Sequence, residues 1–267
     1  MAGEYTKFEI MDGVGIITMD RPESRNALIP DMVAEMGEAI QACKRTAVRA
    51  VLLTGSGGGF CSGADLKFVV ESLENQAQEG LQEYIRTLAS DLHTKVVLEL
   101  QRLEKPVVAS INGVAAGAGF SLMLGCDIRI AANSARFLMA YANIGAPADG
   151  GSSYLLPRLV GAGRAMELYL ASQPTGAPAA LEMGLVTQLV EEDSLHRHAM
   201  ETTVRLAQGP TTAYAKVKGL FNSSWDNDLA TQLDAETETF AEVALTADFQ
   251  EGIKAFTERR QARFEGK

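Results

Sequence analysis

The chain has 267 residues, of which 46% are hydrophobic, and its 34 acidic residues outnumber its 24 lysines and arginines to give a formal charge of −10. A chain of this length can bury a sizeable core without disulfides. Its acidic balance argues against nucleic acid as a partner, because phosphate contacts need a clustered basic surface.

The cysteines and the chain start indicate a reducing compartment. Cys43, Cys61 and Cys126 cannot all pair, and the first residues lack the basic and then apolar order of a secretion signal. We therefore expect a cytoplasmic protein. The longest uncharged stretch, residues 106–126, contains four glycines and begins like a strand, so no membrane span is expected. The three histidines show no HExxH spacing, and we expect no metal site.

Short β-rich runs alternate with helical patterns in the first half of the chain. Residues 14–20, 49–55, 105–113 and 127–134 are dense in β-branched residues, which predicts strands. The apolar spacing over residues 31–45 predicts a helix, and residues 70–104 form a longer helical region that we expect to break near Gly80. This alternation predicts an α/β fold with crossover connections.

The second half changes character after about Gly161, where nearly all of the chain follows a helical pattern and only residues 185–190 resemble a strand. The apolar positions of the last helical segments need a partner surface, either the first domain or another subunit. These positions are Leu220, Phe221, Trp225, Leu229, Leu233, Phe240, Val243, Phe249, Ile253 and Phe256.

Two glycine-rich segments each follow a predicted strand: LLTGSGGGFCSGADLK (52–67) and NGVAAGAGFSLMLGCD (112–127). The first lacks the GK[ST] ending of a P-loop. Small residues let a backbone approach a ligand closely, and peptide N–H groups at a helix start suit a negative oxygen. The two turns are therefore predicted to aim backbone donors at one oxyanion, although close helix–strand packing also uses such glycines.

A dinucleotide-binding site is the rival interpretation of the first segment. It falls one residue short of TGxxxGxG, because Cys61 stands where the last glycine would be, and YAKVK (214–218) supplies a Tyr-x-x-x-Lys spacing. The glycine fingerprint of a dehydrogenase should follow the first strand, whereas two strands and a helix precede it here. An NAD(P)-dependent dehydrogenase is therefore a distant alternative.

The motifs FCSGADL (60–66) and NGVAAGAGFSLMLGCDIRIA (112–131) resemble the paired motifs of the crotonase superfamily, the enoyl-CoA hydratases and isomerases. Flanking segments agree in order and spacing, so the resemblance covers essentially the whole chain; they are residues 21–28, 144–161, 165–170, 180–190 and 251–264. The resemblance implies a spiral of ββα units over residues 1–193 that holds an acyl-CoA site. It also implies a C-terminal helical trimerisation region over residues 194–267 and a homotrimer or homohexamer.

The resemblance also assigns site residues. The backbone N–H groups of Ala64 and Ala118 would form the oxyanion hole for the thioester oxygen, with Ala118 in place of the usual glycine. Arg25 would approach the CoA phosphates. The residues expected on the adenine and pantetheine side are Ser62, Ala64, Asp65, Leu66 and Lys67. Because CoA is part of the substrate, no separate cofactor is expected.

The residues that would carry protons decide the expected reaction. Water addition in this family resembles a mechanism with two glutamates. At the two positions where those glutamates would stand, this sequence has Ser121 and Tyr141, which we expect to line the substrate pocket. A hydroxyl near its ordinary pKa cannot replace a carboxylate at neutral pH, so hydratase activity should be weak or absent. Asp149 matches the proton-moving aspartate of the ring-modifying isomerases of phenylacetate degradation, which the local sequence also resembles; a helix cap is its alternative role.

These expectations combine into an enoyl-CoA isomerase without a cofactor. Ala64 and Ala118 would polarise the thioester carbonyl, and Asp149, in an apolar pocket, would remove a proton from the acyl chain and return it at another carbon. Cys61 is expected to pack rather than to act as a nucleophile. The alternatives are a hydratase-like enzyme and an acyl-CoA-binding protein with little catalysis.

Overall fold

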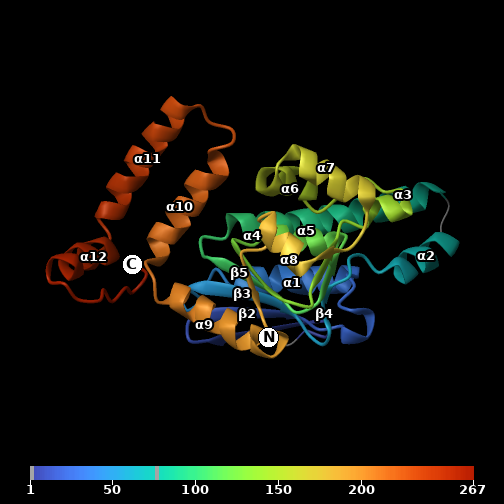
Figure 1. The fold of residues 1–267 in the computed structure, drawn as a ribbon, viewed down its shortest axis with the longest axis horizontal. Helices are drawn as coiled ribbons and strands as arrows, with labels where there is room; N and C mark the ends of the chain where they lie inside the picture. Colours follow the sequence, from blue (N-terminus) through green and yellow to red (C-terminus); the bar gives the residue numbers. More distant parts are fainter. Residues whose placement is uncertain (1–2, 76–77) are drawn as a thin grey trace.

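The computed structural model describes residues 3–75 and 78–267. Its larger sheet has six strands, in the order β1-β2-β3-β5-β7-β10. The first pair is antiparallel and the later pairs are parallel, so the expected crossover connections are present. The strands are β1 (Thr6–Met11), β2 (Val14–Met19), β3 (Ala50–Gly55), β5 (Val107–Ile111), β7 (Ile128–Ala132) and β10 (Gln188–Val190) (Figure 1).

A second sheet of four very short strands, in the order β4-β6-β8-β9, was not predicted. Runs of two or three residues are too short to show a period of two. The strands are β4 (Gly59–Cys61), β6 (Val114–Ala116), β8 (Arg136–Leu138) and β9 (Thr175–Gly176). β4 and β6 pair in parallel, with Gly59 opposite Val114 and Cys61 opposite Ala115. Because each strand runs directly into one glycine turn, this pairing sets the two turns side by side.

Helices cover the sheets as the periodicity predicted, with one difference. The helices of this half are η1 (Pro22–Ser24), α1 (Pro30–Ala42), α2 (Leu66–Glu74), α3 (Gln78–Asp91), the π-helix η2 (Leu92–Val97), α4 (Leu98–Arg102) and α5 (Ala118–Leu124). The break expected near Gly80 lies a few residues earlier, between the end of α2 at Glu74 and the start of α3 at Gln78, so that Gly80 itself is helical. A single glycine costs a helix only about 1 kcal/mol. Residues 76 and 77 lie outside the described residues.

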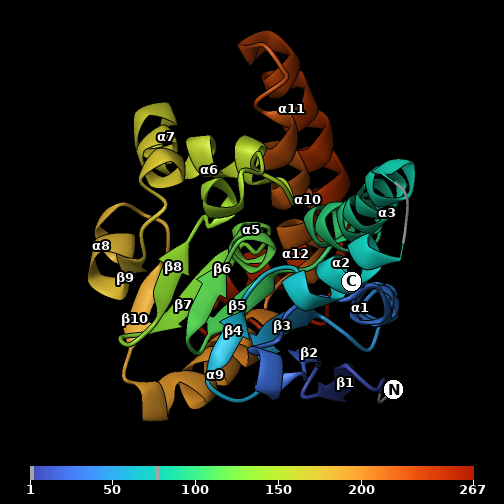
Figure 2. The same ribbon diagram turned by 90° about the vertical axis from the view of Figure 1, so that its right-hand side faces the viewer.

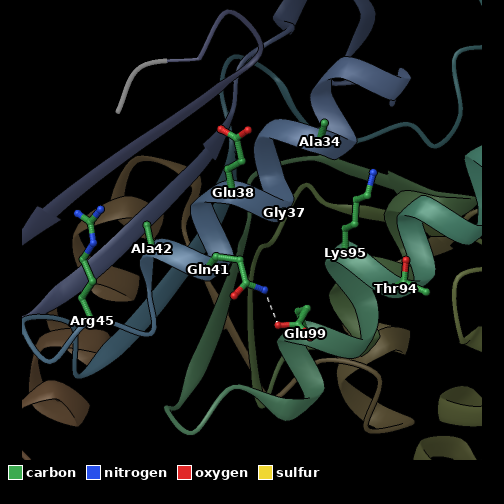
Figure 3. A pocket seen from close by; sticks show the side chains of 9 residues that line it. All are labelled: Ala34, Gly37, Glu38, Gln41, Ala42, Arg45, Thr94, Lys95 and Glu99. Carbon is green, nitrogen blue, oxygen red and sulfur yellow. Dashed lines mark hydrogen bonds between the residues drawn. The ribbon is translucent and has the colours of Figure 1, made fainter.

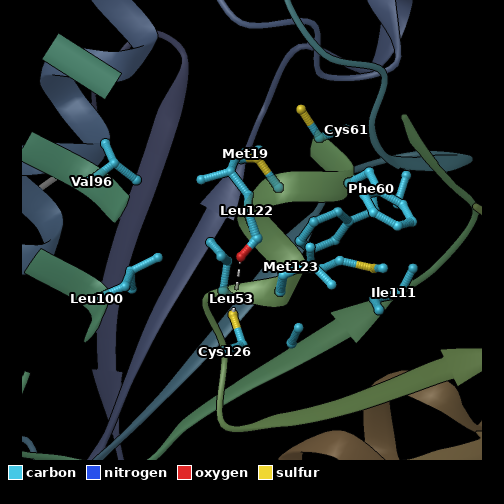
Figure 4. Packing of buried hydrophobic residues seen from close by; sticks show 14 of the residues in the cluster. Met19, Leu53, Phe60, Cys61, Val96, Leu100, Ile111, Leu122, Met123 and Cys126 are labelled. Carbon is cyan, nitrogen blue, oxygen red and sulfur yellow. Dashed lines mark hydrogen bonds between the residues drawn. The ribbon is translucent and has the colours of Figure 1, made fainter. Parts of the chain in front are cut away.

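Helix α5 is buried along its whole length. Figure 4 shows its Leu122 and Met123 among side chains from β2, β3, β4, β5, η2 and α4. A helix that is apolar on every side is stable only inside a core. The apolar run after the second glycine turn is therefore explained by packing, and the start of this helix is held rigidly.

The remaining helices form two groups. They are η3 (Tyr141–Ile144), α6 (Ser152–Val160), α7 (Ala162–Ala171), α8 (Ala177–Glu182), η4 (Glu192–Ser194), α9 (Leu195–Ala207), α10 (Thr211–Ser223), α11 (Leu229–Ala244) and α12 (Ala247–Thr257). α9 packs on the sheet through Leu195, Ala199 and Ala207. In contrast, α10, α11 and α12 stand away from the body (Figures 1 and 2).

The projecting helices carry many exposed apolar side chains, including Phe221, Trp225, Leu229, Phe240 and Phe256. Monomeric proteins rarely expose this much apolar surface, so these helices are expected to pack against a partner. The domain boundary after residue 193 stays a prediction. The first helix after this boundary, α9, packs on the large sheet and does not project with α10, α11 and α12 (Figure 1). Within the described ranges 3–75 and 78–267, no helix combines the length and apolar character needed to cross a bilayer.

Candidate active site

The two glycine turns are in direct backbone contact. Gly63 has a φ of +96°, and a Cβ atom built on it would lie 2.9 Å from the carbonyl oxygen of Ala116 and 3.3 Å from the nitrogen of Ala118. A Cβ on Gly119 would overlap the carbonyl oxygen of Cys61. Only glycine allows this positive φ and this approach without strain. The glycines therefore bring the backbone of residues 62–64 against the start of α5.

The N–H groups of Ala64 and Ala118 are both free to bind a ligand. Leu28 forms a parallel bridge with Ala64, in which Leu28 donates to Gly63 (2.7 Å) and accepts from Asp65 (3.0 Å). That pattern leaves the N–H of Ala64 directed away from Leu28. Ala118 is the first residue of α5, where helix N–H groups have no intrahelical acceptor. Over residues 3–75 and 78–267, neither N–H has a hydrogen-bond acceptor, so the pair can stabilise one negative oxygen.

A buried amide that the sequence analysis missed holds the first turn. The side chain of Asn26 donates to the carbonyl oxygens of Gly59 (2.8 Å) and Phe60 (3.2 Å), and it accepts from the N–H of Arg21 (2.8 Å). The first two bonds hold the loop of residues 21–28 against β4, and the third closes that loop on itself. An asparagine in a polar loop gives no local signal of such a role.

The residues predicted on the CoA side divide into two groups. Ser62 and Asp65 use their side chains within the protein: Ser62 donates to Ser24 (3.0 Å), and Asp65 pairs with Arg21 (3.1 Å) and caps α2. Arg25, Leu66 and Lys67 are exposed beside the first turn. Arg25 and Lys67 are therefore the cations available there to an anionic ligand.

Three hydroxyl groups converge on the backbone carbonyl oxygen of Asp149. Ser121 donates to it at 2.8 Å, Ser152 at 2.7 Å and Tyr141 at 3.2 Å, and the Ser121 and Tyr141 hydroxyls lie 2.8 Å apart. Ser121, Tyr141 and Ser152 are all buried, and burial raises the pKa of the Tyr141 phenol. These hydroxyls are thus neutral and fix the peptide of Asp149, whereas the sequence led us to expect Ser121 and Tyr141 to line the pocket.

The carboxylate of Asp149 contacts a histidine that the sequence analysis did not select. Oδ1 of Asp149 lies 2.6 Å from Nε2 of His93, on η2. The N–H of Gly150 also points to this nitrogen, at a longer 3.3 Å. The side chains of His93 and Asp149 are 40% and 34% exposed. The expected apolar pocket around Asp149 is therefore wrong on this side, because an imidazole and solvent meet the carboxylate.

The start of α5 connects the two halves of this site. Ala118 and Ser121 are three residues apart in the helix, about 4.5 Å along its axis, and Ser121 is bonded to Asp149. The helix that begins at Ala118 is therefore bonded directly to the segment that carries the His93–Asp149 pair. Tyr141 and Ser121 have no hydrogen bond to a carboxylate side chain in the described part of the chain.

Other possible sites on the chain are less suited to chemistry. A surface cavity of about 680 Å³ lies between α1 and the η2–α4 helix (Figure 3), but its Glu99 is engaged by Gln41 and Lys44, both at 2.6 Å. Burial raises the pKa of Cys61 to about 12, so its thiol stays neutral. The described residues form no cluster of three histidine, cysteine or acidic side chains suited to a metal.

The Tyr-x-x-x-Lys spacing does not form a dehydrogenase site. Lys218 donates to the carbonyl oxygen of Leu100 (2.9 Å) and pairs with Asp127 (3.0 Å). These bonds attach α10 to α4 and to the start of β7. Lys218 is therefore a structural residue.

Comparison with known proteins shows which family the chain resembles over its whole length. The sequence profile of the family described as Enoyl-CoA hydratase/isomerase matches residues 9–267. A Rhodobacter capsulatus protein named probable enoyl-CoA hydratase is 39% identical over 267 residues, all of both chains. The 1,2-epoxyphenylacetyl-CoA isomerase of Escherichia coli is 37% identical over 265 residues, 99% of each chain.

A solved structure from Mycobacterium abscessus, described as an enoyl-CoA hydratase/isomerase, superposes with a TM-score of 0.93 at 35% identity. The match covers 98% of this chain and 100% of that one. The predicted crotonase fold is thereby confirmed.

Proposed function

The chain belongs to the enoyl-CoA hydratase/isomerase family, and from that premise we propose that it is an isomerase that moves a double bond within an enoyl-CoA thioester. The observation that carries the proposal is the link through α5, which begins at Ala118 and whose Ser121 bonds the peptide of Asp149. Among the described residues, Ser121 and Tyr141 have hydroxyl and backbone partners rather than a second carboxylate. A single carboxylate suits a reaction in which one proton leaves and returns.

The glycine turns supply electrostatic stabilisation. The N–H groups of Ala64 and Ala118 bind the thioester oxygen, whose negative charge grows when a proton leaves the acyl chain. Each such donor typically contributes about 3 kcal/mol to the stability of a transition state. The close backbone contact at Gly63 and Gly119 supports this role, because it fixes both donors before the substrate arrives.

Asp149 carries the proton. Its carboxylate removes a proton from one acyl carbon, the electron pair moves into the enolate, and the same oxygen returns the proton at another carbon. A positioned acid–base of this kind contributes roughly 100- to 10,000-fold. No cofactor takes part in these steps, and CoA remains attached to the acyl group throughout.

Water addition is the second candidate, favoured by the name of the Rhodobacter capsulatus relative. It needs one group to activate water and another to protonate the acyl carbon. Ser121 and Tyr141 are bonded to the backbone of Asp149, and the pKa of Tyr141 is raised, so neither suits these tasks. Because Asp149 is then the one proton carrier proposed for the site, isomerisation is favoured over water addition.

The test is Asp149→Asn, assayed for double-bond migration and for hydration on a panel of 2-enoyl- and 3-enoyl-CoA thioesters. We expect isomerisation to fall by about 1,000-fold or more while CoA-ester affinity changes little, since the amide keeps the shape but cannot take up a proton. Isomerisation at the wild-type rate in this variant would refute the assignment of Asp149. A wild-type protein that hydrates but does not isomerise would favour the second candidate.

We further propose that the protein assembles as a homotrimer or homohexamer through α10, α11 and α12. The exposed side chains of Phe221, Trp225, Leu229, Phe240 and Phe256 support this, because burying each would contribute about 1.5–3 kcal/mol. Light scattering at micromolar concentration should give a mass three or six times that of the chain. A monomer would contradict the proposal.

A further inference from the structure

We propose that His93 is a positioning residue that holds Oδ1 of Asp149, so that Oδ2 is the oxygen that exchanges a proton with the substrate. This inference rests on the proposed function of Asp149. It assigns a role to a side chain that neither a motif nor the glycine turns indicate.

The distance itself requires a proton between the two groups. Nε2 of His93 and Oδ1 of Asp149 are 2.6 Å apart, at the short end of charge-assisted N–H···O hydrogen bonds, which are typically about 2.7–2.9 Å long. Without a proton on the line between them, two lone pairs would face each other at this distance. Because Asp149 acts as an ionised base, this proton belongs to Nε2, which donates to Oδ1 and leaves Oδ2 to accept the substrate's proton. The N–H of Gly150, at the longer distance of 3.3 Å, then lies beside Nε2 without donating to it.

His93 lies in a π-helical turn that directs its side chain toward Asp149. The N–H of Leu98 donates to the carbonyl oxygen of His93, an i to i+5 bond, and residues 92–97 form a π-helix between α3 and α4. π-helical turns are rare and are often found at functional sites. Leu92, Val96 and Val97 of this turn are buried, whereas His93 is turned to Asp149. The apolar anchors fix the turn from which the imidazole reaches out.

The backbone of Asp149 is already fixed on the other side. Three hydroxyls bond its carbonyl oxygen, and Gly150 has a φ of +60°, where a Cβ would lie 2.7 Å from the Cβ of Ser121. The torsions of the Asp149 side chain are the freedom that remains. The bond from His93 removes it, and orientation of a catalytic group to within about 1 Å is worth roughly 100-fold.

The experiment compares His93→Leu with His93→Gln in the full-length protein. The leucine variant should lose about 10- to 100-fold in kcat with a KM within about threefold of wild type, because the carboxylate rotates freely but the substrate still binds. The glutamine variant should recover most of kcat, since its amide N–H can donate to Oδ1. His196→Leu, on an exposed face of α9, is the control and should match wild type.

Two outcomes of these assays would overturn the proposal. One is a leucine variant with wild-type kcat, and the other is a glutamine variant as slow as the leucine variant, which would mean that the imidazole does more than donate a bond.

The nitrogen resonances of His93 give a test that does not depend on the reaction. In ¹⁵N spectra of the wild-type protein, the Nε2 resonance should show a proton in a strong hydrogen bond, and Asp149→Asn should shift it. An unshifted His93 resonance would overturn the proposal even if the enzyme isomerises. A shifted resonance with no isomerisation would leave the His93 bond intact and place the failure in the proposed function.

Discussion

The glycine turns and the Asp149 segment face the same site but carry their chemistry on different parts of the chain. In the turns, the proposed functional groups are peptide N–H groups of Ala64 and Ala118, and the side chains only need to be small. In the Asp149 segment, the functional group is a side chain, and its partner His93 lies 56 positions earlier. Backbone chemistry therefore leaves a visible composition in the sequence, whereas side-chain chemistry depends on contacts that only the fold creates.

The strongest test of this difference between backbone and side-chain chemistry is Ala118→Pro, which removes a backbone donor without adding a polar group. Proline is tolerated at the first position of a helix, which Ala118 occupies in α5. We expect a loss of about 100-fold or more in kcat with the fold retained. Stopped-flow or steady-state assays and circular dichroism would measure both properties.

The matched control for this substitution is Ala118→Gly, which keeps the N–H and should retain most of the activity. If the proline variant folds and turns over normally, the N–H of Ala118 takes no part in the reaction. If glycine is as damaging as proline, the side chain matters and the distinction between the two regions fails.

A smaller effect is expected from the hydroxyls that hold the Asp149 peptide. Tyr141→Phe and Ser121→Ala each remove a buried hydroxyl that contacts both the carbonyl oxygen of Asp149 and the other hydroxyl, which should lower the free energy of unfolding by about 1–3 kcal/mol. We expect each kcat to fall by only about 3- to 10-fold, since the other hydroxyls still bind the carbonyl oxygen of Asp149. Urea unfolding and steady-state kinetics on the same preparations would check this.

A loss of several hundredfold in Tyr141→Phe without loss of stability would mean that the phenol itself moves a proton. That result would bring back the second candidate function, because water addition needs a second proton carrier.

The long strands and the helices were predictable because their signals are local. β3, β5 and β7 are runs of β-branched residues, and α1 shows a regular apolar face. Strands β4 and β6 were missed because three residues carry too little pattern, although they align the glycine turns.

A candidate site could be predicted from the sequence where a family motif or composition marked it, as at Asp149 and the two glycine turns, and the roles of these residues stay predictions. Nothing around His93 distinguishes it from a surface histidine, because its role comes from a π-helical turn and from a residue brought close by folding. The partner of Ser121 and Tyr141 was missed for a related reason, because only the fold brings their hydroxyls to the backbone oxygen of Asp149; their place in the pocket lining stays a prediction.

The burial of α5 makes stability and catalysis inseparable at this helix. Its first residue presents a donor to the site, its fourth bonds the peptide of Asp149, and the rest of it fills the core. Interiors are close-packed, so a change of volume is transmitted as a displacement. A substitution at Leu122 or Met123, whose side chains lie in the core, is therefore expected to shift both halves of the site at once. Engineering this enzyme for heat resistance through the core around α5 will therefore also change its activity.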